Sequence, residues 1–243
     1  MLVKDRLVAD SGWIAHPGST VLNLYRPPTL EHGDPDKVGP WLDHLHLIYP
    51  NDADHIERVL AHRVQRPHEK INHALFLGGG QGIGKDSLIE PVRRGVGPWN
   101  VQEVSPRVVL ESQFTGYLKS VILRISEARD LGDHNRFVFY DHMKTYTAAP
   151  PETLRVNEKN IKEYYVFNCC LVIITTNYKM DGIYLPADDR RHYVAWSDLT
   201  KDDFDADYWK KLYQYYDSGG DGHVVAYLAS LERSRRCRAT GRS

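Results

Sequence analysis

The sequence predicts an α/β fold in which a mainly parallel sheet is flanked by helices. Short apolar runs rich in β-branched residues recur along the chain, separated by helical or long connections, as expected for strands covered on both faces. One of these runs, residues 74–77, leads into a glycine-rich segment, and a segment compatible with a helix follows it. The length of 243 residues suits one such domain with additions at its ends.

Residues 1–66 are expected to form irregular structure or small strands followed by one helix. Prolines interrupt the short apolar pieces in residues 1–50, which argues against an independent core there. Residues 51–66 predict a helix, because Ile56, Val59, Leu60 and Val64 fall on one face. The proline at position 67 is expected to end it.

Residues 67–200 are expected to form the core of the domain. The strand at 74–77 is followed by a helix from about position 85, which Pro91 is expected to kink or shorten. Further strands are predicted at residues 101–104, 120–125, 169–175 and 192–196. Residues 201–232 predict C-terminal helices, at 202–216 and 224–231, and the basic tail 233–243 is expected to be disordered.

Composition excludes several classes of protein. There are 31 Lys and Arg residues against 32 Asp and Glu, a net charge of −1, so a nucleic-acid site would have to be a local basic patch. The three cysteines show neither metal-ligand nor disulfide spacing, which suits a reducing compartment. No stretch has the length of a membrane span, and the N-terminus does not resemble a signal peptide. We therefore expect a cytoplasmic protein without a membrane partner.

The glycine-rich segment nearly matches the phosphate-binding loop G-x-x-x-x-G-K-[ST]. In such a loop the backbone N–H groups face one anion, the lysine reaches the outer phosphates, and the helix N-terminus adds a favourable dipole. The positions expected to bind nucleotide are Gly79, Gly80, Gln81, Gly82, Ile83, Gly84, Lys85, Asp86 and Ser87. Asp86 stands where Ser or Thr usually ligates magnesium, and Ser87 comes one position late. A purely structural turn before a helix is the alternative.

A second acidic position follows the strand at 120–125. Enzymes with a phosphate-binding loop use a carboxylate at the end of a buried strand to orient water and hold magnesium. Glu127 is the candidate general base here, and a surface glutamate is the alternative. Asp86, Ser126 and Glu127 are the candidate metal ligands, with the carboxylate on the loop and the hydroxyl on the strand. Alternatively, phosphates and water hold most of the magnesium shell.

Polar residues also follow the strand at 169–175. Asn177 can hydrogen-bond a terminal phosphate or the attacking water. Arg190 and Arg191 come shortly before the last predicted strand. They could form a solvated cluster of ion pairs, or neutralise charge on a phosphate bound by a neighbouring subunit.

In this order and spacing the motifs resemble superfamily III helicases, in particular the helicase half of phage and prophage primase-helicase proteins. The resemblance implies a P-loop NTPase of AAA+ type that uses ATP and Mg²⁺. It further implies a homo-oligomeric ring, usually a hexamer, which hydrolyses ATP at subunit interfaces and moves on single-stranded DNA during replication in a bacterial host cytoplasm. The primase would be encoded elsewhere, because the sequence shows no primase domain.

The resemblance also assigns roles to residues. Lys85 grips phosphate, Glu127 activates water, Asn177 senses the γ-phosphate, and Arg190 or Arg191 completes the neighbouring site. A DNA-contacting β-hairpin is implied at 155–165, where Lys159 and Lys162 alternate with tyrosines; a solvated charged hairpin is the alternative.

Two other functions fit the same loop. The first is a P-loop phosphotransferase such as a small-molecule kinase, which would need an acceptor pocket and a lid. The second is a non-catalytic remnant of a primase-helicase that keeps the assembly surface without the chemistry.

Overall fold

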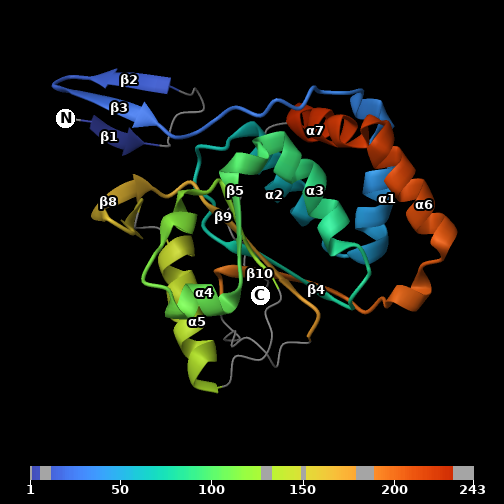
Figure 1. Cartoon of the computed structure of the whole chain (residues 1–243). Helices are drawn as coiled ribbons and strands as arrows, with labels where there is room; N and C mark the ends of the chain where they lie inside the picture. The colour runs from blue at the N-terminus through green and yellow to red at the C-terminus, as the bar shows by residue number, and fades with distance from the viewer. Residues whose placement is uncertain (1, 6–11, 127–132, 149–151, 179–188, 232–243) are drawn as a thin grey trace.

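The computed structural model of the chain describes residues 2–5, 12–126, 133–148, 152–178 and 189–231. A sheet of five parallel strands forms the middle layer (Figure 1). Its strands, in spatial order, are β10 (His192–Ser197), β4 (Ala74–Gly79), β9 (Leu171–Thr176), β6 (Ile122–Ile125) and β5 (Val101–Val104). Because every neighbouring pair is parallel, the carboxyl ends of all five strands share one edge of the sheet. The predicted fold class is confirmed.

Strand β4 illustrates why the central strands are continuously apolar. Side chains alternate between the two faces of a strand, so successive residues belong to different cores. Leu75 and Leu77 pack into one hydrophobic cluster, whereas Ala74 and Phe76 pack into a second. Both faces of the sheet are therefore covered, and no position on this strand is left for a solvated side chain.

Four helices pack against the first cluster (Figure 1). They are α1 (Gly39–Ile48), α2 (Ala53–Gln65), α3 (Lys85–Val96) and α7 (Asp221–Ser230). Helix α1 starts with a proline in its first turn, where the missing N–H would be unpaired in any case. Its residues Trp41, Leu45 and Ile48 are then buried in the core. Helix α6 (Ala206–Tyr215) precedes α7 and joins it through the kinked segment Tyr216–Gly220.

The opposite face carries α4 (Pro106–Glu111), α5 (Asp133–Thr147) and a hairpin of β7 (Thr153–Glu158) and β8 (Ile161–Phe167). Phe139, Met143 and Tyr146 of α5 follow helical spacing and are buried in the second cluster. Leu154 and Val156 of the hairpin join them. The hairpin is thus attached to the core through one face only.

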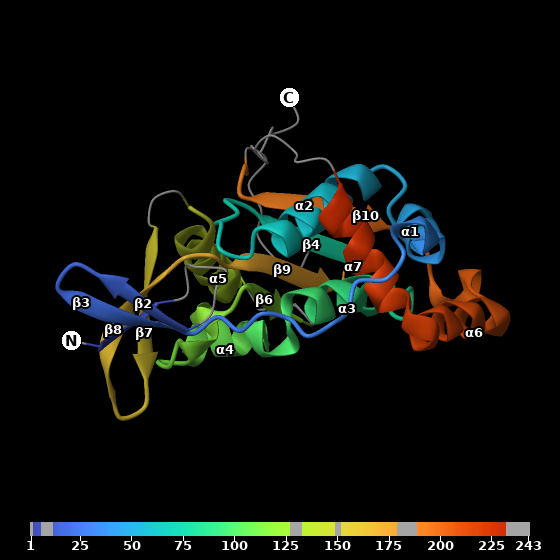
Figure 2. The ribbon, with the colours of Figure 1, turned by 90° about the horizontal axis from the view of Figure 1, so that it is seen from above.

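A separate three-stranded sheet precedes these elements, formed by β1 (Leu2–Asp5), β2 (Gly12–His16) and β3 (Ser19–Asn23) in the order β1-β3-β2. Strand β1 contacts β8. Figure 2 shows this sheet and the hairpin at one end of the molecule, with α6 at the other. Short 3-10 helices at Pro35–Lys37, Pro98–Asn100, Gly116–Lys119 and Lys201–Asp203 lie in the connections.

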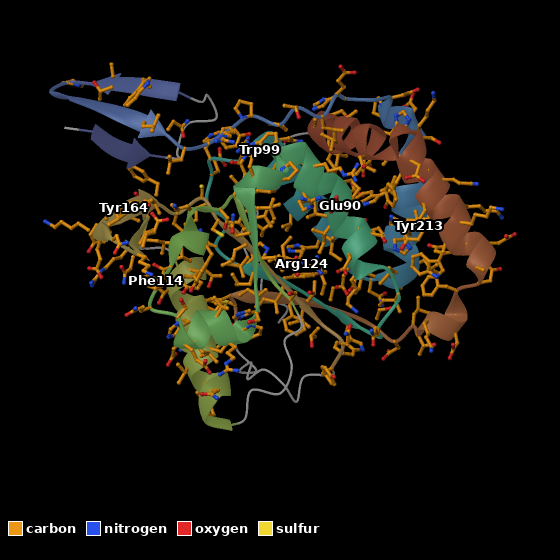
Figure 3. All side chains as sticks on the ribbon, viewed as in Figure 1. Glu90, Trp99, Phe114, Arg124, Tyr164 and Tyr213 are labelled. Carbon is orange, nitrogen blue, oxygen red and sulfur yellow. The ribbon has the colours of Figure 1, made fainter. Side chains whose placement is uncertain are left out.

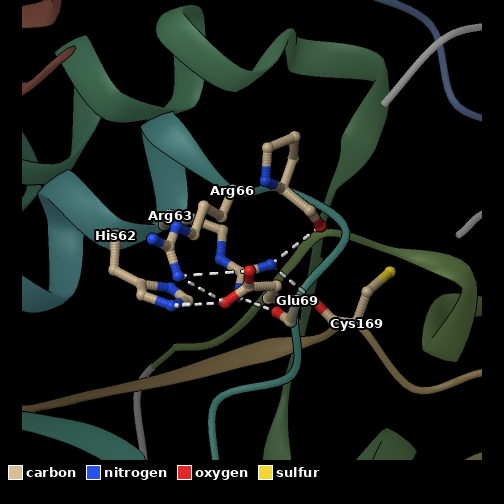
Figure 4. A network of polar contacts seen from close by, with 6 residues as sticks. His62, Arg63, Arg66, Glu69 and Cys169 are labelled. Atoms are coloured by element: carbon tan, nitrogen blue, oxygen red, sulfur yellow. Dashed lines mark hydrogen bonds and ion pairs between the residues drawn. The ribbon is translucent and has the colours of Figure 1, made fainter. Parts of the chain in front are cut away.

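A buried arginine fixes the end of α2 to the start of β9 (Figure 4). Arg63 is fully buried, and its guanidinium donates to the carbonyls of Pro67 at 3.0 Å, Glu69 at 2.6 Å and Cys169 at 2.6 Å. Backbone carbonyls thus take the place of solvent around the charge. The adjacent residues Cys169 and Cys170 are buried and form no disulfide. Their role is therefore structural.

Several elements depart from the sequence-based expectations. Helix α1 lies within a segment expected to be irregular, and α4 and α5 were not predicted. The polar residues of α5 obscure its helical spacing, which becomes clear only when Phe139, Met143 and Tyr146 are seen buried. Helix α3 runs through Pro91 to Val96 instead of ending there. Helix α6 starts at Ala206, later than expected, because Asp205 caps it by accepting from the N–H of Tyr208.

Within the described residues, no helix is both long and apolar enough to cross a bilayer.

Candidate phosphate-binding cleft

The glycine-rich loop leaves β4 at Gly79 and enters α3 at Lys85. Its residue Gly84 has a φ of 88°, a conformation that other residues adopt only at a cost. A Cβ there would lie 2.4 Å from Nε2 of His44 on α1 and 2.7 Å from Trp209 on α6. The same His44 Nε2 donates to the Gly84 carbonyl at 3.2 Å, which leaves Nδ1 to accept from the Tyr208 hydroxyl at 2.5 Å. Helices α1 and α6 therefore support the loop from behind.

Replacing Gly84 with alanine should lower the free energy of unfolding by about 1–3 kcal/mol, because it adds both backbone strain and a clash with His44. Gly219→Ala is the matched control: Gly219 has a φ of 93°, but nothing lies within 4 Å of where its Cβ would be. Urea unfolding of both variants separates the cost of backbone strain from the cost of the clash. If both variants lose the same free energy of unfolding, His44 and Trp209 move to accommodate the added methyl group.

Lys85 is the central side chain of the loop. It is buried, and its Nζ donates to the carbonyls of Gly79 and Gly80, both at 2.8 Å, and to Oδ1 of Asn177 at 2.9 Å. Burial lowers the pKa of Lys85 to about 8, opposed by the nearby carboxylate of Asp86. All three donors of the ammonium are used on neutral oxygens. An incoming anion would be the stronger acceptor, since charge-assisted hydrogen bonds are about twice as strong.

The loop opens into a cleft of about 510 Å³ at the carboxyl edge of the sheet. Ligands of parallel α/β sheets commonly bind at this edge. The lining residues come from the loop, from the ends of β5, β6 and β9, and from α6: Gln81, Gly82, Gly84, Lys85, Asp86, Ser87, Glu103, Arg124, Ser126, Thr175, Thr176, Asn177, Trp209 and Tyr213. The fold thus brings together Lys85, Asp86, Ser126 and Asn177, four of the predicted site residues.

Arg124, labelled in Figure 3, lines the cleft together with Lys85 and was not predicted as a site residue. Its side chain is 18% exposed, and Nη2 donates to Oδ1 of Asp86. Nη1 lies 3.6 Å from Oε2 of Glu103. Nε is buried with no hydrogen-bond partner among the described residues, at a cost of about 1–3 kcal/mol. The guanidinium is therefore held by one carboxylate but is not fully satisfied.

This arrangement bears on the predicted magnesium ligands. Asp86 was expected to bind the metal together with Ser126, yet its Oδ1 accepts from a guanidinium. Among the described residues, no group of three or more His, Cys, Asp or Glu could hold a metal ion. Glu127 lies outside those residues, so its predicted role stays a prediction. Asp86 forms an ion pair with Arg124, and its predicted role as a magnesium ligand together with Ser126 also stays a prediction.

Two aromatic side chains from α6 close the other side of the cleft. The rings of Trp209 and Tyr213, one helical turn apart, have centroids 6.0 Å apart and an interplanar angle of 28°. Tyr213 is 52% exposed (Figure 3). An exposed aromatic face beside a phosphate-binding loop can stack on a planar base.

Arg190 and Arg191 do not line this cleft. They come directly before β10, whose first residue His192 pairs with Ala74, the first residue of β4, and the Arg191 carbonyl accepts from the Ala74 N–H at 2.7 Å. The loop leaves the opposite end of β4. At about 3.3 Å per residue, the six-residue strand puts roughly 17 Å between the two ends. These arginines therefore cannot reach the phosphate loop of their own chain.

The hairpin expected at 155–165 is confirmed as β7 and β8, paired antiparallel around a turn at Lys159 and Asn160. Lys159 and Lys162 are exposed at its tip, and neither has an ion-pair partner in the described part of the chain. Beside the turn, Glu158 accepts from Lys119 and from Tyr164, both at 2.5 Å. Because Glu158 is the last residue of β7 before the turn, this ion pair holds the turn end of the hairpin, while Lys159 and Lys162 face solvent.

Sequence reasoning missed six residues of the cleft, of which Thr175 and Thr176 directly precede the predicted Asn177. Arg124 carried a signal, because it interrupts an otherwise apolar strand. Trp209 and Tyr213 carried a weaker one, an aromatic pair four residues apart on a predicted helix. Glu103 carried none, since nothing local connects it to the loop.

Residues 76–191 match a family of unknown function, DUF5906. The chain is also 25% identical, over 224 residues, to the DNA primase-polymerase of Nitratiruptor phage NrS-1. That match covers 90% of this chain but 30% of the relative, so the chain spans less than a third of the relative's length.

Solved structures of the C-terminal region of NrS-1 are similar to this chain in fold. An apo structure of the C-terminal region of NrS-1 aligns with a TM-score of 0.77 and 21% identity, covering 96% of this chain and 56% of that one. A second apo form of the region aligns with a TM-score of 0.75 and 22% identity, covering the same shares. At these identities the likeness establishes the fold: a parallel-sheet α/β domain with a glycine-rich loop after β4.

Proposed function

We propose that this chain is an ATP-hydrolysing motor domain of a DNA helicase or translocase that acts in phage or prophage replication. The observation that carries the proposal is Lys85, held by the glycine-rich loop and Asn177 at the mouth of a 510 Å³ cleft. The relative of this chain is a phage DNA primase-polymerase, which favours a replication role.

In this proposal, the loop and Lys85 bind the phosphates of ATP, and Asn177 hydrogen-bonds the terminal phosphate or the attacking water. Trp209 and Tyr213 offer a surface for the base. Glu127 would accept the proton of the attacking water. Mg²⁺ would take part in the hydrolysis step, held by phosphates and water. Arg190 and Arg191 would serve a neighbouring subunit of a homo-oligomeric ring, because the length of β4 and β10 separates them from their own loop.

Single-stranded DNA is the proposed polymer, and the hairpin tip is its proposed contact. Two exposed lysines beside the exposed Tyr165 suit backbone neutralisation and base stacking. ATP hydrolysis measured with and without single-stranded DNA tests the function as a whole. Stimulation by DNA supports a motor, whereas hydrolysis indifferent to DNA, or none at all despite nucleotide binding, would contradict it.

Removing both hairpin lysines should weaken DNA binding equally for all sequences. In Lys159→Ala/Lys162→Ala, the log–log slope of affinity against salt should fall by about 1.4, or about 0.7 for each lost phosphate contact on a single strand. Basal ATP hydrolysis should persist while its stimulation by DNA falls. Lys37→Ala/Lys144→Ala removes the same charge elsewhere and should leave the slope unchanged. If both double variants behave alike, the DNA contact lies away from the hairpin.

A phosphotransferase is the second candidate, and one observation favours it. A groove of about 340 Å³ adjoins the cleft and shares Asp86, Glu103, Arg124 and Tyr213 with it. An acceptor molecule there would lie beside the terminal phosphate. Transfer of phosphate to a small molecule, without any effect of DNA on the rate, would favour this function over the motor.

A further inference from the structure

The cleft presents two cations to a ligand, from opposite sides. Lys85 follows β4, Arg124 lies on β6, and β9 runs between these strands. Thr175, Thr176 and Asn177 at the end of β9 line the cleft between the two cations. Adjacent strands are about 4.8 Å apart, so an anion of several linked phosphates lying across the end of β9 would face both cations.

Asp86 stands at the loop position whose side chain usually binds the metal, and in this structure it binds Arg124. Its carboxylate comes from the first turn of α3 and holds the Arg124 guanidinium from β6. Asp86 holds Arg124 through Oδ1 only, and its side chain is 74% exposed. A divalent cation on the other carboxylate oxygen would lie next to the Arg124 guanidinium, which is 82% buried, and the two positive charges would repel each other. The observed pair therefore disfavours a divalent ion at Asp86.

We infer that Arg124 is a second phosphate-binding residue of this cleft, acting in place of a divalent cation so that nucleotide binding is nearly independent of Mg²⁺. The inference rests on the proposed nucleotide site. A guanidinium suits the role, since its fork of N–H donors pairs with two phosphate oxygens at once. Nη1 has only a loose contact with Glu103, at 3.6 Å, which leaves it able to donate to such a ligand.

Calorimetric titration with ADP, in saturating Mg²⁺ and in EDTA, tests this on the purified chain. For the wild type, the Kd should differ by less than about threefold between the two buffers. Arg124→Gln should weaken binding in EDTA by about tenfold or more, the effect of losing one charge-assisted contact. Arg124→Lys should lie between, because it keeps the charge without the fork. Arg93→Gln is the matched control, since Arg93 pairs with Glu90 outside the cleft and should bind as the wild type does.

Asp86→Asn separates this role from a structural one. It frees Arg124 without removing it, so affinity in EDTA should be kept or increased. If Asp86 were a metal ligand, the same variant would instead lose affinity only in Mg²⁺. If thermal unfolding shows that Arg124→Gln does not fold, Asp86→Asn and Arg124→Lys still test the inference.

The two proposals fail in different ways. Absence of ADP binding in both buffers would overturn the nucleotide site and the inference with it. Binding by the wild type that falls more than about tenfold in EDTA, or equal affinities of Arg124→Gln and the wild type in EDTA, would overturn the inference. Either of these results leaves the nucleotide site standing.

Discussion

Lys85→Ala should abolish ATP hydrolysis while the protein stays folded. The ammonium is the one cation that the loop itself provides, and loss of one such electrostatic group typically costs about 10²–10³-fold in rate. The fold should tolerate the change, because the lysine's hydrogen bonds and its burial cost oppose each other. A shift in Tm of no more than a few degrees, about 1 kcal/mol for a domain of this size, would agree with this.

The measurement is steady-state phosphate release beside thermal unfolding of the same preparation. Lys37→Ala is the control, since Lys37 lies on the surface in an ion pair with Asp34 and should leave the rate unchanged. Hydrolysis by Lys85→Ala at the wild-type rate would remove the loop from the mechanism. Such a result would leave its lysine with a purely structural role in joining Gly79, Gly80 and Asn177.

Arg190→Ala/Arg191→Ala should lose hydrolysis at least as completely, for a different reason. An arginine supplied to a neighbouring site contributes about 10³–10⁵ in rate in related chemistry. The arginines start β10 at the edge of the sheet opposite the loop, so their loss should leave nucleotide binding to the same chain largely intact. Binding retained with hydrolysis lost is therefore the expected pattern.

Mixing this variant with Lys85→Ala tests whether the arginines act between subunits. At equal ratio in a ring with head-to-tail interfaces, about a quarter of the interfaces would join an intact loop to an intact arginine pair. Activity should return in that proportion, although each variant alone is inactive. If mixed oligomers form, as shown by differently tagged chains, and no ratio restores hydrolysis, the arginines do not complete a neighbour's site.

The parts of the site that are contiguous in the chain could be predicted from sequence. Residues 74–85 specify strand, turn and helix in succession, because a run of apolar residues and the glycines after it act over a few residues. The hairpin at 155–165 was likewise expected, on the strength of the family resemblance, and its lysines do lie exposed at the tip. These features depend on local conformation, which residues close together in the sequence determine.

The pairing of Arg124 with Asp86 was decided by tertiary structure alone. The two residues are 38 positions apart and meet because β6 lies two strands from β4, an order set by how the helices pack on both faces. The same packing brings Trp209 and Tyr213 to the loop and puts Arg190 and Arg191 at the far edge of the sheet. Sequence therefore determined that a glycine-rich loop leads from a strand into a helix. The strand order determined which charges face that loop, since side-chain proximity across a sheet follows from spatial neighbours that no local pattern encodes.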